Sequence, residues 1–169
     1  MLFTFTSFSQ ESTKSNKDSK ITFTIKNFGF NVDGNFNTFT VLSNFDAQPL
    51  KESFFNAEIQ VNSIFTDSKS RDEHLLEADY FDAEKYPKII FNSTAIEEIE
   101  SSKYVLKGFI TIKGIKKRVE TALDIIVSKE NTVFKANFKL DRKDFNVGGN
   151  SFVLSNSVDI KMTYVSTKN

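Results

Sequence analysis

The sequence predicts an all-β domain, an antiparallel β-barrel of about eight strands, with one short helix inserted between the third and fourth strands. From Ile21 onward apolar and polar residues alternate with a period of two, as expected for strands that bury one face. The chain also has 19 phenylalanines and no tryptophan, and phenylalanine favours strands. A β-sandwich is the competing architecture, since it would show the same alternation.

Composition excludes several classes of function. The 169 residues are enough for one domain with a sizeable core. The 22 basic and 22 acidic residues cancel, which argues against broad electrostatic capture of nucleic acid or anionic membrane. The absence of cysteine excludes disulfides, thiolate metal sites and cysteine nucleophiles. No apolar run reaches the roughly 18 residues that a membrane-spanning helix needs.

The first 20 residues differ from the rest. Met1 to Gln10 is apolar and aromatic, and Glu11 to Lys20 is polar. The apolar part lacks a basic region and is too short for a complete secretory signal. Residues 1–20 are therefore interpreted either as the remnant of a signal peptide or as a disordered leader, and residues 21–169 as the barrel domain.

Three strands are expected before the helix. Bends at residues 29–34 separate the first strand from the second, and a loop at residues 46–53 precedes the third. Their inward residues are Ile21, Phe23 and Ile25, then Phe39, Val41 and Phe45, then Phe55, Ala57, Ile59 and Val61.

Five strands are expected after the helix. The fourth opens at Ile89 and Phe91 and reaches about Ile99, and Gly114 marks the turn between the fifth and the sixth. The inward residues of the last four strands are Tyr104, Leu106, Gly108, Ile110 and Ile112; Val119, Leu123, Ile125 and Val127; Phe134, Ala136, Phe138 and Leu140; and Val158, Ile160, Met162 and Tyr164.

The stretch from Ser70 to Thr94 carries the helix. Ser70 and Glu73 have the spacing of a capping box, and Asp72 adds negative charge to the first turn. Pro87 ends anything helical. This segment is expected to fold across one end of the barrel as a brace.

The same stretch resembles a known family. Residues 71–75 (Arg-Asp-Glu-His-Leu), 79–82 (Asp-Tyr-Phe-Asp), 86–87 (Tyr-Pro) and 89–94 (Ile-Ile-Phe-Asn-Ser-Thr) are similar to the signature block of the YceI-like family of lipocalin-like, polyisoprenoid-binding proteins. Further matches, in the expected order, are Gly34 with Phe36 and Phe39, residues 108–114 and residues 141–145.

The resemblance implies an eight-stranded barrel with a helix after its third strand, a periplasmic or secreted location, frequent dimers and, in some members, a long isoprenoid chain inside. The chain departs from the family pattern in two places. Ser19 and Lys20 stand where a histidine is often found, and the loop between the seventh and eighth strands is expected to be short.

The charged cluster around the only histidine has two interpretations. His74 with Asp72 and Glu73 suggests a metal site or an acid–base pair, but zinc needs three or four convergent ligands and any nucleophilic triad would have to centre on His74. The structural interpretation is that the motif ties the helix to the barrel rim. We expect no catalytic and no metal-binding residue; the structural motif comprises Ser70, Arg71, Asp72, Glu73, His74, Tyr86 and Pro87.

The densest basic patch, residues 113–118, falls at a predicted turn. Charge there is usually solvated, and lysine also protects sheet edges. The other interpretation is contact with anionic lipid head groups at a membrane surface.

The phenylalanine-rich interior is either a solid core or a ligand tunnel. Small inward residues (Ala57, Gly108 and Ala136) either leave space or offset bulky neighbours. The resemblance favours a tunnel that holds a polyisoprenoid, an isoprenoid quinone or a fatty acid, with no required cofactor. Its predicted lining is Phe23, Ile25, Phe39, Phe55, Ile59, Phe91, Leu106, Ile110, Leu123, Phe134, Phe138, Ile160 and Met162.

The sequence therefore predicts an extracytoplasmic binding or carrier protein for a long apolar chain, without catalysis. The alternative is a ligand-free stress-response or interaction module that acts through its surface and a dimer interface.

Overall fold

The computed structural model describes residues 12–14, 18–47, 50–101 and 103–167, and its eleven strands form one antiparallel sheet. Their order is β1-β4-β5-β7-β8-β9-β10-β11-β2-β3-β6. The strands are β1 (Ser12–Lys14), β2 (Lys20–Asn27), β3 (Phe30–Phe36), β4 (Phe39–Asn44), β5 (Phe54–Gln60), β6 (Ile64–Phe65), β7 (Lys88–Glu100), β8 (Lys103–Ile112), β9 (Ile115–Val127), β10 (Asn131–Asp141) and β11 (Leu154–Thr167). The helices are α1 (Lys69–Leu75) and the 3₁₀ turns η1 (Leu50–Glu52), η2 (Val61–Ser63) and η3 (Arg142–Phe145).

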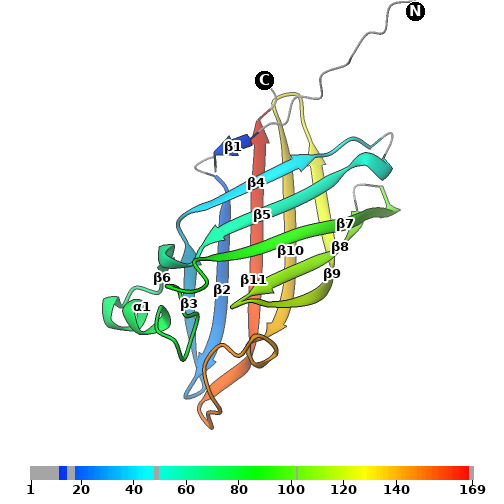
Figure 1. Ribbon diagram of the computed structural model, residues 1–169. Coiled ribbons are helices and arrows are strands. Elements are labelled where there is room, and N and C mark those ends of the chain that lie inside the picture. Colours follow the sequence, from blue (N-terminus) through cyan, green and yellow to red (C-terminus); the bar gives the residue numbers. More distant parts are fainter. Residues whose placement is uncertain (1–11, 15–17, 48–49, 102, 168–169) are drawn as a thin grey trace, which may run out of the picture.

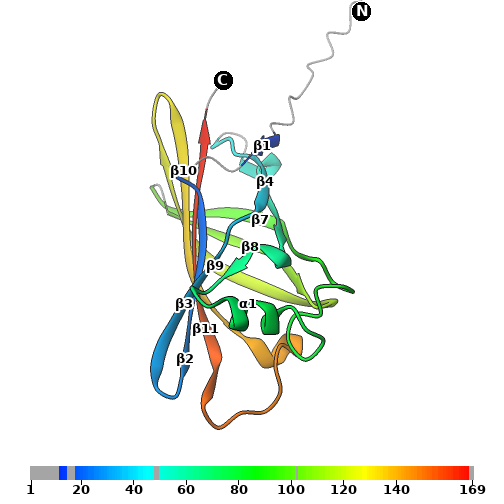
Figure 2. The same ribbon diagram turned by 90° about the vertical axis from the view of Figure 1, so that its left-hand side faces the viewer.

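The sheet curls into a half-barrel. β4, β5, β7 and β8 cross in front of β2, β10 and β11 at a large angle, and Figure 2 shows the curl in profile (Figures 1 and 2). The chain passes directly from β3, next to one end of the strand order, to β4, next to the other end. There Asn37 N donates to Ser63 O and Gln60 N donates to Thr38 O, each at 3.0 Å.

The predicted fold class is confirmed, and all eight expected strands are present. The strand count was too low, because β1, β3 and β6 were not expected. β3 (Phe-Asn-Val-Asp-Gly-Asn-Phe) is rich in turn-forming residues, and β6 has only two residues, so neither shows a clear strand pattern. One continuous sheet excludes the two separate sheets of a sandwich.

The upper end of the barrel, away from α1, is solidly packed. The rings of Phe55, Phe134 and Tyr164 lie 5.5–5.8 Å apart between centroids, and Phe45 packs edge-on against Phe134 at 5.8 Å. Leu123, which pairs with Ala136 of β10, is completely buried. The predicted inward faces are correct here except at Val127, which is 56% exposed at the end of β9.

The helix starts two residues earlier than the expected capping box. Its N-cap is Ser68, which makes no side-chain cap bond, and α1 begins at Lys69. Ser70 therefore lies inside the first turn, and Glu73 instead faces Lys69, with Nζ and Oε1 3.7 Å apart. The capping-box prediction was wrong because Asp67, with φ of 59°, turns the chain into the helix before Ser70.

The connection from β10 to β11 runs from Arg142 to Val153 and includes η3, so the expectation of a short loop was wrong. At the position where the family often has a histidine, Ser19 is buried, and its Oγ accepts a hydrogen bond from Val165 N at 3.0 Å.

Most of the expected leader, including Met1 to Gln10, lies outside the described residues. One part of the expected leader, Ser12–Lys14, is described: it forms β1, which pairs with β4. Among the described residues there is no helix of the length and hydropathy needed to cross a bilayer.

Candidate functional site

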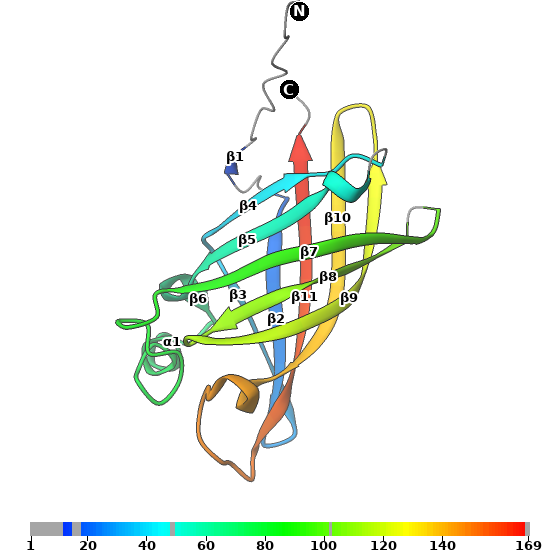
Figure 3. The ribbon, with the colours of Figure 1, turned by 45° about the vertical axis from the view of Figure 1, so that its right-hand side comes forward.

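A cavity of about 540 Å³ occupies the end of the half-barrel where α1 lies. Its lining residues come mainly from β2, β3, β11, α1, the segment that follows α1, and the β10–β11 connection, and Figure 3 shows how these elements are arranged. Most lining residues are apolar. They are Phe23, Ile25, Phe28, Val32, Phe36, Ile64, Leu75, Tyr80, Phe81, Ile89, Ile112, Leu140, Phe145, Val147, Val153, Leu154, Val158 and Ile160, with Asn27, Thr66, Arg71, His74, Arg142, Gly149, Asn150 and Ser151 as the others.

Aromatic rings build one wall. The Phe23 ring covers Gly34 so closely that a Cβ on Gly34 would lie 2.3 Å from its Cζ. Phe23 packs against Phe36 at 5.7 Å between centroids, and Phe36 meets Phe81 edge-on at 6.3 Å. Gly34 therefore fixes the position of Phe23, and through it the shape of the wall.

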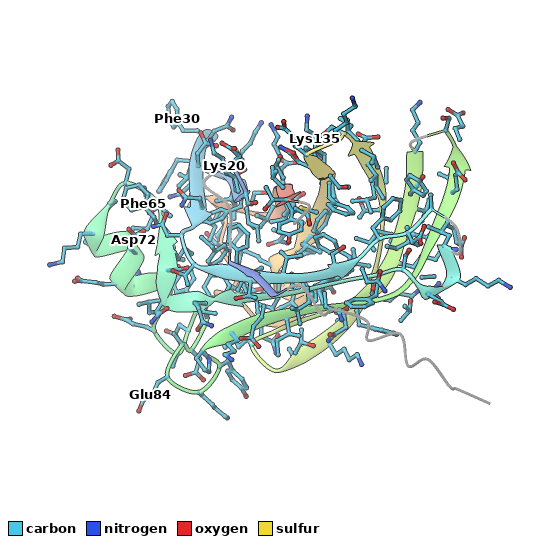
Figure 4. The ribbon with its side chains drawn as sticks, turned by 90° about the horizontal axis from the view of Figure 1, so that it is seen from above. Lys20, Phe30, Phe65, Asp72, Glu84 and Lys135 are labelled. Atoms are coloured by element: carbon cyan, nitrogen blue, oxygen red, sulfur yellow. The ribbon has the colours of Figure 1, made fainter. Side chains whose placement is uncertain are left out.

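A brace of three residues, Thr66, Arg71 and Asp72, fixes α1 to the end of β6. Asp72 Oδ1 accepts hydrogen bonds from Thr66 N at 2.9 Å and Thr66 Oγ1 at 2.6 Å. Arg71 Nε donates to Thr66 Oγ1 at 2.7 Å, and Arg71 Nη2 donates to Thr66 O. Figure 4 shows Asp72 on the helix close to Phe65 of β6. Arg71 and Asp72 thus tie the helix to the rim.

His74 has a different place from that expected. Its ring meets Tyr80 edge-on at 4.8 Å, and Nε2 lies 3.8 Å from Glu77 Oε2, a pair in which both side chains are more than half exposed. His74 lines the cavity but does not bond to the rim. In the part of the chain that the structure describes, no three His, Asp or Glu side chains are grouped to hold a metal ion.

Tyr86 and Pro87 hold the segment between α1 and β7 against the barrel. The Tyr86 ring packs on the β8–β9 turn, where a Cβ on Gly114 would lie 2.7 Å from its Cε1. The Pro87 carbonyl accepts a hydrogen bond from Val61 N at 2.9 Å. Within this segment, Tyr80 and Phe81 line the cavity, whereas Tyr86 does not.

Arg142 is the main structural residue that sequence reasoning left without a role. It is only 5% exposed, and its guanidinium donates to four carbonyls and one side-chain amide in the β10–β11 connection and the start of β11. The acceptors are the backbone oxygens of Ser155, Val147, Gly149 and Leu154, and Asn156 Oδ1. Its signal in the sequence was the match of residues 141–145 to the family.

The basic patch at residues 113–118 forms the expected turn. Lys113 Nζ donates to Ala78 O at 2.7 Å and Asn146 O at 2.9 Å, which joins two walls of the cavity. Lys117 Nζ lies 3.6 Å from Asp144 Oδ1, and Lys116 Nζ lies 4.6 Å from the centre of the Phe109 ring. These lysines therefore have neighbours within the protein.

The structure divides the predicted lining into two groups. Phe23, Ile25 and Ile160 line the cavity, and the other ten do not. Several of those ten, including Phe55, Leu123 and Phe134, fill the packed end instead. Gly108 offsets a bulky neighbour rather than leaving space, because a Cβ there would lie 2.7 Å from the Phe91 ring.

The family model described as the YceI-like domain matches residues 13–165. The chain belongs to the YceI-like family. A UPF0312 protein of Photorhabdus laumondii is 34% identical over 133 residues, which cover 75% of this chain and 69% of the relative. Protein YceI of Escherichia coli O157:H7 is 27% identical over 154 residues, which cover 87% of this chain and 80% of the relative.

Solved structures share the fold. The crystal structure of Burkholderia cenocepacia BcnA superposes with a TM-score of 0.84 at 27% identity, over 88% of this chain and 96% of BcnA. A domain from Saccharophagus degradans, described as polyisoprenoid-binding and implicated in plant cell wall breakdown, has a TM-score of 0.74 at 11% identity. The superposition covers 95% of this chain and the whole of that domain, and at 11% identity the similarity shows only that the fold is shared.

Proposed function

We propose that this protein binds one long apolar chain of the isoprenoid type in the cavity beside α1, as an extracytoplasmic carrier that performs no chemistry on it. The observation that carries this proposal is the cavity itself, about 540 Å³ with predominantly apolar walls. Ligand sites in proteins usually have volumes of roughly 300–1,000 Å³ and apolar walls with a few polar groups.

The energetics favour a long chain over a short one. Each buried methylene contributes about 0.8 kcal/mol, so ten carbons contribute about 8 kcal/mol. Association costs about 4–15 kcal/mol in lost freedom of motion. A ligand must therefore bury more than about ten carbons to bind well, which suits an isoprenoid chain of several units or a long fatty acid.

The polar residues of the cavity suggest where a head group lies. Arg71 uses Nε and Nη2 on Thr66, and its Nη1 hydrogens take no part in those bonds. His74 lines the same cavity, and its imidazole can donate or accept a hydrogen bond. We assign the quinone carbonyl, hydroxyl or carboxylate of the ligand to this side of the cavity. The polyisoprenoid-binding description of the Saccharophagus degradans domain supports the ligand class through shared fold.

The test is native mass spectrometry of the protein after incubation with an isoprenoid quinone delivered from ethanol. We expect one quinone per chain. Ile160→Asp places a carboxylate in the cavity wall and should abolish the adduct, whereas Ile126→Asp makes the same change at a residue that is 53% exposed on β9 and should leave it intact. Failure of the wild-type protein to retain any quinone, fatty acid or polyprenol would refute the proposal and favour a ligand-free interaction module.

A further inference from the structure

An exposed aromatic tip borders the cavity. We define it as Phe28, Phe30, Phe152 and Val153. Phe28 is 70% exposed and Phe30 is 77% exposed, Phe152 is fully exposed, and Val153 is 39% exposed. Figure 4 shows Phe30 at the outer edge of the molecule. Exposed single apolar residues are common, but three phenylalanines from two separate segments form a patch that needs an explanation.

Two loops bring these residues together. The β2–β3 turn and the connection before β11 lie side by side at the lower end of the half-barrel in all three ribbon views (Figures 1, 2 and 3). Phe28 N donates to Val153 O at 2.9 Å, which fixes one loop to the other. Phe28 and Val153 also line the cavity, so the aromatic tip is part of the cavity rim.

The turn keeps an aromatic residue at an unfavourable position. Phe28 has φ of 50° and Gly29 has φ of 81°, so both central residues of this two-residue turn are left-handed. Such turns favour Asn, Asp or Gly at the first of these positions, and a bulky residue with positive φ is uncommon. A phenylalanine at this position suggests a use for its exposed ring.

The tip carries no charge. Residues 27–32 and 147–158 contain no Lys, Arg, Asp or Glu, in a chain where 44 of 169 residues (22 basic and 22 acidic) are charged. Their polar residues are asparagine and serine, which are neutral. Charged side chains are costly below the head groups of a bilayer, whereas aromatic residues are enriched at the interface between membrane and water. The composition of the tip suits this interface.

A second copy of the chain is a poorer match for the tip. An aromatic side chain buries about 150–250 Å² at most, so these three phenylalanines offer on the order of 500 Å². A standard protein interface buries about 800 Å² on each partner. A bilayer imposes no such minimum contact area, because its lipids rearrange around a small inserted apolar group.

We propose that the aromatic tip inserts into the head-group layer of a lipid bilayer and holds the cavity rim against the membrane. Ligand transfer at this contact rests on the proposed function: an apolar chain that is insoluble in water passes between the bilayer and the cavity without entering the aqueous phase. The proposal of membrane binding depends only on the aromatic tip and not on the proposed function. Because the tip is neutral, attachment needs no anionic lipid and depends little on salt.

Flotation with phosphatidylcholine vesicles tests this proposal. Phe30 and Phe152 do not line the cavity, so Phe30→Ser/Phe152→Ser removes two of the three exposed rings of the tip and changes no residue of the cavity wall. The matched control, Ile99→Ser/Ile126→Ser, removes two exposed apolar residues elsewhere, which are 63% and 53% exposed. We expect the tip variant to partition at least tenfold less than wild type, the control to match wild type, and 0.5 M NaCl to change partitioning less than twofold.

Quinone delivered from ethanol, measured by native mass spectrometry, separates this proposal from the proposed function. The tip variant should bind quinone from ethanol normally but take it up from vesicles at least tenfold more slowly. Wild-type protein that does not float, or a tip variant that floats as well as the control, overturns the proposal. So does a wild-type dimer in sedimentation velocity that only the tip variant abolishes, because the tip would then be a self-association surface. If the protein floats with vesicles but does not bind quinone, the proposed ligand binding in the cavity is refuted, and membrane insertion of the tip is still supported.

Discussion

Replacing Arg142 with methionine should cost more stability than any other single arginine substitution in the described chain. Arg142 is 5% exposed and donates five hydrogen bonds, four of them to backbone carbonyls. Methionine keeps an unbranched stem like the aliphatic part of arginine but has no donors, so Arg142→Met removes the partner of all five acceptors. The prediction therefore isolates the hydrogen bonds from the packing of the aliphatic stem.

The magnitude follows from the number and kind of bonds. A hydrogen bond to a charged group contributes about 1.5–3 kcal/mol, and losses within one network are not additive. An acceptor left unsatisfied costs about 1–3 kcal/mol, so with non-additive losses we expect the free energy of unfolding to fall by about 3–5 kcal/mol. For a chain of this size the melting temperature should fall by about 6–20 °C.

Urea unfolding followed by circular dichroism gives the free energy, and Arg118→Met is the matched control. Arg118 is 69% exposed, and its Nη2 lies 4.0 Å from Glu120 Oε2, so its loss should cost less than about 0.5 kcal/mol. If Arg142→Met and Arg118→Met unfold at the same urea concentration, the β10–β11 connection is not held by Arg142, and the reasoning fails.

Three further predictions concern other parts of the structure. Asp72→Ala should lower the free energy of unfolding by about 1–3 kcal/mol, because it removes the acceptor of both Thr66 N and the Thr66 hydroxyl, whereas Glu73→Ala, which removes only an exposed ion pair, should cost less than about 0.5 kcal/mol in the same urea assay. Gly34→Ala should displace the Phe23 ring and weaken quinone binding several-fold, while Gly149→Ala, where a Cβ meets nothing within 4 Å, should not; equal affinities in a titration would contradict the wall described here. Burial, and then the charge of Glu98, raise the pKa of Tyr104 above its ordinary value near 10. The folded state thus favours the neutral phenol, so this contribution is complete below about pH 10 and is lost as the pH rises through the folded-state pKa. Melting temperatures from pH 8 to pH 11 should fall more steeply for wild type than for Tyr104→Phe, and parallel curves would count against this assignment.

The sequence was a good guide to the sheet and a weaker guide to the site. Period-two alternation in β8 is preserved in the structure, with Tyr104, Leu106, Ile110 and Ile112 buried, because strands buried on one face show their pattern locally. β3 was missed because its Asp, Asn and Gly have turn propensity, and only its pairing with β2 makes it a strand.

The cavity could not be located from alternation, which gives the face of a strand but not the position along the barrel. Phe134 and Phe23 both point inward, yet one fills the packed end and the other lines the cavity. The difference arises from contacts between segments distant in sequence: α1 is fixed through Thr66, and the β10–β11 connection is fixed through Arg142. Such contacts leave no periodic signal.

The most direct test of the proposed function is methyl NMR of the protein titrated with an isoprenoid quinone. We predict saturable shifts at one quinone per chain for the methyl groups of Ile25, Ile89 and Ile160, which line the cavity. The methyl groups of Leu123 and Ile125, which are buried in the packed end, should remain unchanged. Shifts confined to Leu123 and Ile125, or no saturable shift at any of these residues, would contradict the conclusion that the cavity beside α1 holds an apolar chain.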